Sequence, residues 1–244
     1  MNLVTFVRSG SMVALLLAGL ALGTGDARAT AQCCIVPDVG GTAAVPPACP
    51  SGYQDSQTIS LNGLPPGTPV LGTLSIIQIN NGPEAPGGSL GGTTQSNVAT
   101  LVLHLVGTGS FVYNRVLSFP ITLDTEAAPR VPLAPLQSFA MELVHLQGQL
   151  AAGDPDFDLL RVTAGSGFGM PSPGHTTLTI AGPGWGVDSF FDITYRLDYV
   201  GHPGGPFGGY SNSQIESLQP FDMCHSRATA AQVSSWGAVK SIYR

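Results

Sequence analysis

The clearest pattern of hydrophobic and polar residues in the chain covers residues 185–199. The odd positions carry mainly apolar and aromatic side chains, and the even positions carry mainly charged, polar or small ones. Successive side chains of a β-strand point to opposite faces, so this alternation predicts a half-buried strand of an antiparallel sheet. The predicted inward positions are Trp185, Val187, Ser189, Phe191, Ile193, Tyr195, Leu197 and Tyr199.

Shorter apolar or alternating runs predict further strands, at residues 58–61, 70–79, 98–106, 116–123, 139–150, 157–163, 176–180 and 213–218. Pro120 lies within 116–123, and because proline has no N–H to donate to a sheet, that segment is predicted to be an edge or bulged strand. Turns rich in Gly and Pro separate the runs, at residues 80–83, 86–88, 165–174 and 202–209. About nine strands separated in this way predict an all-β fold, an antiparallel β-sandwich or jelly roll.

The first 31 residues have the pattern of a cleavable signal peptide. Arg8 precedes an apolar run at 12–22, and small-x-small triplets follow at 27–29 and 29–31. The run of about eleven residues is shorter than the roughly 20 that a membrane-spanning helix needs, which favours cleavage over a retained anchor. We therefore expect a secreted protein with an extended cysteine-containing segment at 32–56, a β-sandwich domain at 57–225 and a C-terminal tail at 226–244.

Composition narrows the classes of partner. The chain has a formal net charge of −6, and Lys240 is its one lysine. Without a basic cluster that could neutralise phosphates, neither nucleic acid nor an anionic membrane surface is expected as a partner. Only 10% of the residues are charged and 43% are hydrophobic, which indicates an ordered core.

The four cysteines are expected to form disulfides. Cys33, Cys34 and Cys49 lie near the predicted mature N-terminus and Cys224 lies near the C-terminus. Four cysteines allow three pairings, and a bond between the adjacent Cys33 and Cys34 would strain the peptide between them. One short N-terminal loop and one long bond to Cys224 are therefore favoured. A zinc site of four thiolates is the alternative, and an exported chain without a C-x-x-C pair disfavours it.

Three segments resemble a known family. They are GDPDFDLLRVTAG at 153–165, FGMPSPGHTTLT at 168–179 and VDSFFDITYR at 187–196. Together they resemble an uncharacterised family of secreted bacterial β-sandwich-like proteins, so the resemblance implies export and fold but no activity. The ending WGAVKSIYR at 236–244 is similar to the endings of other exported bacterial proteins, where it is either a sorting tag or a short packed element.

Two groups of carboxylates are candidates for chemistry. Asp154, Asp156 and Asp158 would project from one side of an extended segment, where calcium could relieve their repulsion, although the EF-hand spacing is absent. Solvated turn carboxylates are the alternative. Asp188, Asp192 and Asp198 share the polar face of the strongest strand with Arg196, either as an ion-paired surface or as the carboxylate pair of a glycoside hydrolase.

Other catalytic patterns are weak. The chain lacks Gly-x-Ser-x-Gly, and its five histidines show no metal-binding spacing. His104 and His145 fall within predicted strands, where a hydrogen-bonded histidine is expected.

The aromatic residues suggest a possible ligand face. Phe190, Phe207 and Tyr210 lie in or after the strongest strand and could hold a sugar ring if they line one exposed groove. The sequence therefore predicts a secreted structural or adhesive protein, with a cell-surface or matrix polymer or glycan as partner and no cofactor. A carbohydrate-binding module is the alternative, and a carboxylate-dependent glycoside hydrolase is the weaker one.

Overall fold

The computed structural model describes residues 34–65, 67–109 and 111–223. In these ranges the fold is all-β, antiparallel and sandwich-like, as the alternation predicts. The elements are β1 (Cys34–Pro37), β2 (Tyr53–Asp55), β3 (Ile59–Ser60), β4 (Val70–Pro86), β5 (Thr93–Gly107), β6 (Asn114–Ala127), β7 (Leu136–Gln149), β8 (Phe157–Ala164), the 3-10 turn η1 (Ser166–Phe168), β9 (Pro173–Ala181), β10 (Gly184–Gly201) and β11 (Ser211–Asp222). The two strands beyond the predicted nine, β1 and β2, come from the cysteine-containing segment.

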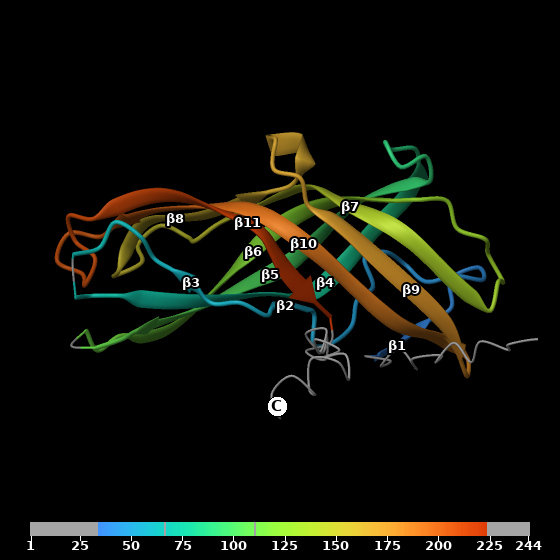
Figure 1. The fold of residues 1–244 in the computed structure, drawn as a ribbon, viewed down its shortest axis with the longest axis horizontal. Coiled ribbons are helices and arrows are strands. Elements are labelled where there is room, and N and C mark those ends of the chain that lie inside the picture. Colours follow the sequence, from blue (N-terminus) through green and yellow to red (C-terminus); the bar gives the residue numbers. More distant parts are fainter. Residues whose placement is uncertain (1–33, 66, 110, 224–244) are drawn as a thin grey trace, which may run out of the picture.

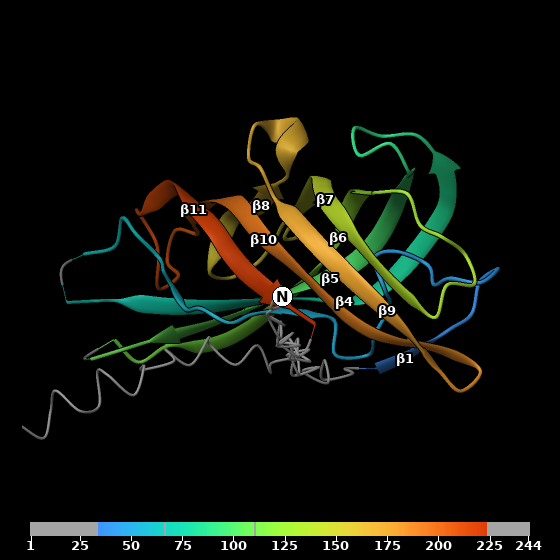
Figure 2. The ribbon, with the colours of Figure 1, turned by 45° about the vertical axis from the view of Figure 1, so that its right-hand side comes forward.

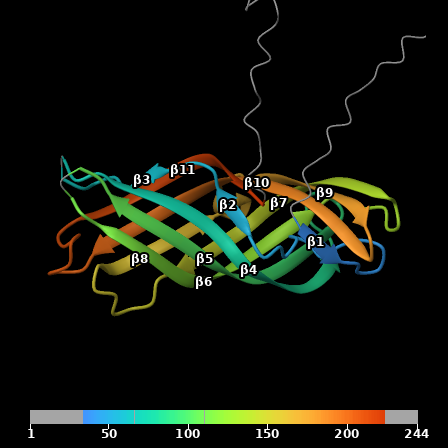
Figure 3. The same cartoon turned by 90° about the horizontal axis from the view of Figure 1, so that it is seen from below.

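The strands form one hydrogen-bonded sheet whose pairings return to their starting point. The order runs from β10 through β11, β2, β4, β5, β6 and β7 to β8, and β8 pairs with β10 again. β8 and β9 lie one after the other between β7 and β10, as a single strand interrupted by η1. Figure 3 shows β4, β5 and β6 crossing one side of the molecule, with β9 and β10 behind them.

The longest strand, β10, confirms the alternation on which the fold prediction rests. All of its predicted inward positions are buried, including Ser189, whose hydroxyl bonds to the hydroxyls of Tyr53 and Thr176. These side chains join one continuous core with the apolar faces of β4 to β8. A void in this core measures about 10 Å³ and is lined by apolar residues, which is too small for a ligand.

The edge-strand prediction for residues 116–123 is correct for part of the segment, because β6 pairs with β5 along its whole length but with β7 only from Ile121 onward. Pairing with β7 begins at Ile121, immediately after Pro120. The proline thus lies where the partner on that side ends, and its missing N–H does not interrupt the β6–β7 ladder.

Candidate functional site

A break in the pairing of β4 with β5 opens the outer surface of the sheet. The register shifts twice, between Ile77 and Asn80 and between Asn81 and Glu84. The segment at 80–83, predicted as a turn, is therefore a bulged part of β4. Gly82 is required there, because a Cβ at this position would collide with the carbonyl oxygen of Ser96 on β5.

Two adjoining hollows lie over this bulge, and we call them together the β4–β7 cleft. The smaller measures about 310 Å³ and the larger about 400 Å³, and both include Ser96 and Asp124. The β4–β5 hairpin and the η1 turn project from the same side of the molecule (Figures 1 and 2). The cleft is lined by Asn80, Asn81, Gly82, Pro83, Ala85, Thr94, Gln95, Ser96, Asn97, Val98, Thr122, Asp124, Thr125, Glu126, Val144 and His145.

An aspartate–histidine pair lies in the larger hollow. His145 Nδ1 is 3.2 Å from Asp124 Oδ2, and both side chains are partly exposed. The ring of Phe168, on η1, meets the His145 ring edge-on with 5.0 Å between centroids and is 43% exposed. Gly167 permits this contact, since a Cβ there would overlap the imidazole. An imidazole, a carboxylate and an accessible aromatic ring thus meet at one end of the cleft.

Beneath the cleft, on the inner face of the sheet that carries the buried Leu123 and Thr125, two side-chain carbonyl oxygens lack a hydrogen-bond partner among the described residues. They are Oε1 of Gln95 and Oδ1 of Asn97, on residues 6% and 4% exposed. Each amide nitrogen is already used, by the carbonyl oxygen of Gly82 for Gln95 and by those of Gln95 and Leu123 for Asn97. Flipping either amide would bring two oxygens together, so the unpaired atoms stay acceptors.

Sequence reasoning did not identify this cleft as a site. It did predict hydrogen-bonded strand histidines, and the structure confirms both: His145 pairs with Asp124, and His104 Nε2 lies 2.8 Å from Asn114 Oδ1. The signal available in the sequence was Asn80 to Pro83, whose composition suits a bulge as well as a turn.

The predicted aromatic ligand face does not form. Phe207 is fully buried and packs on Phe157 and Tyr113 at 4.9 Å between ring centroids. Phe190 stacks on His175 at 6.3 Å, on the part of β10 next to β9, whereas Tyr210 precedes β11 near the opposite end of β10. Burial of Phe207 removes one of the three side chains of the predicted ligand face.

The carboxylates predicted to bind calcium are held by other side chains. Arg115 forms ion pairs with both Asp154 and Asp156, and Tyr113 donates to Asp156 over 2.7 Å. Asp158 instead pairs with His202 at 2.7 Å. Within the described ranges, no group of three His, Cys, Asp or Glu side chains could hold a metal ion. The arginine thus takes the place expected for calcium.

These contacts shift the pKa of Asp154. Burial alone would raise the pKa of its carboxyl, but hydrogen bonds from Arg115 and from the backbone N–H of Asp156 outweigh burial. The pKa of Asp154 is therefore lowered, and the group is ionised at neutral pH.

The carboxylates of β10 do not assemble as a hydrolytic pair around Asp198. Arg161 and Arg196 both reach Asp198 Oδ2, at 2.9 Å and 3.3 Å, and Ser213 donates to Oδ1. Burial would raise the pKa of Asp198, but the bonds from Ser213 and Arg161 lower it. An ionised carboxylate held by two guanidinium groups is not suited to act as a general acid.

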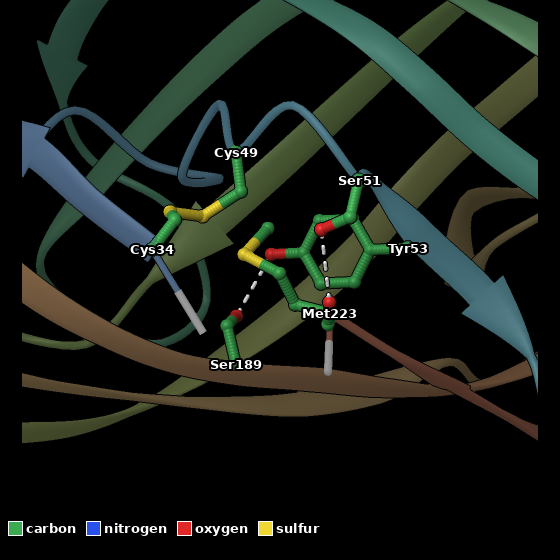
Figure 4. Close-up of a disulfide and its surroundings, with 6 residues drawn as sticks. All are labelled: Cys34, Cys49, Ser51, Tyr53, Ser189 and Met223. Carbon is green, nitrogen blue, oxygen red and sulfur yellow. Dashed lines mark hydrogen bonds between the residues drawn. A yellow bond between two sulfur atoms is a disulfide. The ribbon is translucent and has the colours of Figure 1, made fainter. Parts of the chain in front are cut away.

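One disulfide joins the N-terminal segment to itself. Cys34 on β1 is bonded to Cys49, with 5.9 Å between their Cα atoms (Figure 4). Cys34 lies opposite Val187 of β10, and the Met223 N–H donates to the neighbouring Ser189 carbonyl at 3.0 Å. Cys33, Cys224, the predicted signal peptide and the C-terminal tail lie outside the described residues.

A serine–histidine contact lies on a different surface. Ser138 Oγ is 3.2 Å from His175 Nε2 on the exposed face of β7 and β9. Neither residue lines the β4–β7 cleft. An exposed serine–histidine contact is not by itself a catalytic site, because acyl transfer also needs donors that stabilise the oxyanion.

Among residues 34–223, leaving aside 66 and 110, no helix is long and apolar enough to span a membrane. Comparison of the chain with protein-family models, with curated proteins and with solved structures finds no match.

Proposed function

We propose that the protein is an extracellular adhesive protein that binds a glycan of a cell surface or matrix through the β4–β7 cleft. The observation that carries the proposal is the cleft itself. It joins two hollows, with hydrogen-bonding side chains from four strands and an exposed phenylalanine at one end. Hydroxyl-rich sugars need many directed hydrogen bonds and an apolar surface for the ring face, and this lining offers both.

Rigid support for the cleft favours a binding role. Its side chains come from β4, β5, β6 and β7, which are joined by long ladders, and not from a long loop. A site on strands holds its groups in place before the ligand arrives, so less conformational entropy is lost on binding. The Cys34–Cys49 disulfide supports the extracellular half of the proposal, because such bonds persist in oxidising compartments.

Blocking the cleft tests the proposal. Ser96 is exposed and lines both hollows, so Ser96→Trp should fill their junction. Ser118 is an exposed serine of β6 that lines neither hollow, so Ser118→Trp is the matched control. The purified wild-type protein is screened on an array of polysaccharides and oligosaccharides, and each binder is measured against both variants.

We expect binding that Ser96→Trp abolishes and Ser118→Trp leaves unchanged. Equal binding by wild type and Ser96→Trp would place the ligand elsewhere, and an array without any binder would refute glycan binding. Fractionation of the producing cells tests location separately, and retention in the cytoplasm would contradict the extracellular role.

A further inference from the structure

Two arginine side chains share one carboxylate on the outer face of β8 and β10. Arg161 Nη2 and Arg196 Nε lie 2.9 Å and 3.3 Å from Asp198 Oδ2, and Ser213 donates to Oδ1. Asp198 is buried, whereas the arginine side chains are 36% and 41% exposed. The carboxylate is therefore enclosed by its partners, and one positive charge is left uncompensated at the surface.

Within the described residues, this is the one ion-paired cluster in which arginines outnumber carboxylates. The other two arginines are matched or exceeded by acid, in the pairs Arg115 with Asp154 and Asp156 and Arg130 with Glu84. Glu216 on the neighbouring β11 lies opposite the inward-facing Tyr195, so it projects from the other face of the sheet than Arg196 does. An anion that approaches Arg161 and Arg196 therefore meets net positive charge.

Arg196 also has hydrogen-bond donors that the protein does not use. Its Nε lies near Asp198 without a hydrogen bond, and its Nη1 and Nη2 donate to no acceptor among the described residues. Arg161 uses Nε and Nη2 for Asp198 and keeps Nη1 for other acceptors. The parallel N–H groups of a guanidinium match the two oxygens of a carboxylate, so the outer edge of Arg196 suits such a group.

A row of cross-strand neighbours connects these arginines with the β4–β7 cleft. Thr122, which lines the smaller hollow, pairs with the exposed Gln147 of β7. Gln147 pairs with Thr163 of β8, which in turn pairs with Arg196. Residues paired in this way project from the same face of a sheet. At about 4.8 Å per strand, Arg196 lies roughly 14 Å from Thr122 along the sheet, a span that a short oligosaccharide covers.

We propose that the glycan of the β4–β7 cleft is acidic and extends across β7 and β8, where the carboxylate of a uronic acid unit binds Arg196 beside Arg161. This inference rests on the proposed function and names its ligand class. The cleft holds the ring hydroxyls of the saccharide, and the arginines select its charged unit. A nucleic acid is not the expected ligand, because a row of phosphates needs more than one surplus positive charge.

The test compares two ligands that differ only at the carboxyl group. Affinity for an oligogalacturonate and for its methyl ester of equal length is measured at low salt and about pH 7, where the free carboxyl group is ionised. We expect the acid to bind roughly fivefold more tightly than the ester, the upper range for a partly exposed ion pair. The preference should shrink as ionic strength rises.

Three variants assign the preference to its residues. Arg196→Gln should lower the affinity for the acid to that for the ester, and its unchanged affinity for the ester shows that the variant is folded. Thr73→Glu is the control, because it changes the net charge equally at an exposed position of β4 that lines neither hollow, and it should keep the preference. Ser96→Trp blocks the cleft and should weaken both ligands alike.

The outcomes separate this inference from the proposed function. Equal or tighter binding of the ester, or a preference for the acid that survives Arg196→Gln or is lost equally in Thr73→Glu, would overturn the inference while leaving a glycan site. Binding of neither ligand while a neutral saccharide binds the cleft would overturn it as well. Binding of neither ligand, together with an array that has no other binder, would overturn the proposed function itself.

Discussion

Asp55 offers a direct test of how burial controls the stability of this fold. Its side chain is 5% exposed at the end of β2, where Oδ1 accepts the N–H of Gln57 at 2.8 Å and Oδ2 has no hydrogen-bond partner among the described residues. Burial raises the pKa of Asp55 to about 6 from 3.8; the bond from Gln57 lowers it and the charge of Glu216 raises it further. The folded chain thus holds this proton more tightly than the unfolded chain does.

The sign of the pH effect follows from that difference. Between about pH 4 and pH 6 the unfolded chain has released the proton while the folded chain keeps it, so the contribution of Asp55 to stability falls as pH rises. A shift of about two pKa units corresponds to about 3 kcal/mol, and solvent screening lowers the expected effect to roughly 1–3 kcal/mol. Asp55→Asn removes the titration and retains the acceptor for Gln57.

We therefore expect the difference in free energy of unfolding, Asp55→Asn minus wild type, to be roughly 1–3 kcal/mol larger at about pH 8 than at about pH 4. Urea unfolding of both proteins at each pH, with disulfides intact, measures it. Both proteins contain Asp154 and Asp198, whose lowered pKa values make stability fall in acid. Comparing the two proteins at the same pH removes this shared contribution. A difference that does not change with pH, or one that changes in favour of wild type, would refute the reasoning.

Three further predictions concern the core, the ion pairs and the cysteines. Phe207→Ala should lower the free energy of unfolding by about 3–5 kcal/mol in urea, because the ring is fully buried; a loss below about 1 kcal/mol would contradict its place in the core. A chelator should leave the melting midpoint unchanged, since Arg115 holds Asp154 and Asp156, and a lower midpoint would restore the calcium prediction. Cys34 lies opposite Val187 of β10, and Met223 is hydrogen-bonded to Ser189 two residues further along the same strand. Cys33 directly precedes Cys34 in the sequence, and Cys224 directly follows Met223. Peptide mapping without reduction should link Cys33 to Cys224, and recovery of either as a free thiol would contradict this pairing.

The parts of the fold that depend on neighbouring residues could be predicted from the sequence. Strand parity is one such property, since a period of two sends alternate side chains to the core, and β10 follows it from Trp185 to Tyr199. The same reasoning placed the apolar runs in strands. It could not show that β6 acquires β7 as a second partner immediately after Pro120, because the pairing order depends on the whole chain.

The features that depend on distant residues were missed. Phe207 lies in a Gly- and Pro-rich loop whose composition suggests exposure, and Phe157, 50 positions earlier, covers it only after folding. Arg115 meets Asp154 across 39 positions, so the spacing of the aspartates alone suggested a cation. The bulge of β4 likewise depends on the approach of Ser96, which distinguishes it from a turn.

Mapping the changes in the protein's chemical shifts when a saccharide binds would test the glycan site most directly. Amide resonances of the isotope-labelled protein are followed while the tightest oligosaccharide from the array is added. We predict that the largest shifts fall on residues of the β4–β7 cleft, including Asn81, Ser96, Asp124 and His145, and on Phe168 at its end. Shifts confined to another surface, such as the β7–β9 face around Ser138 and His175, would contradict the account.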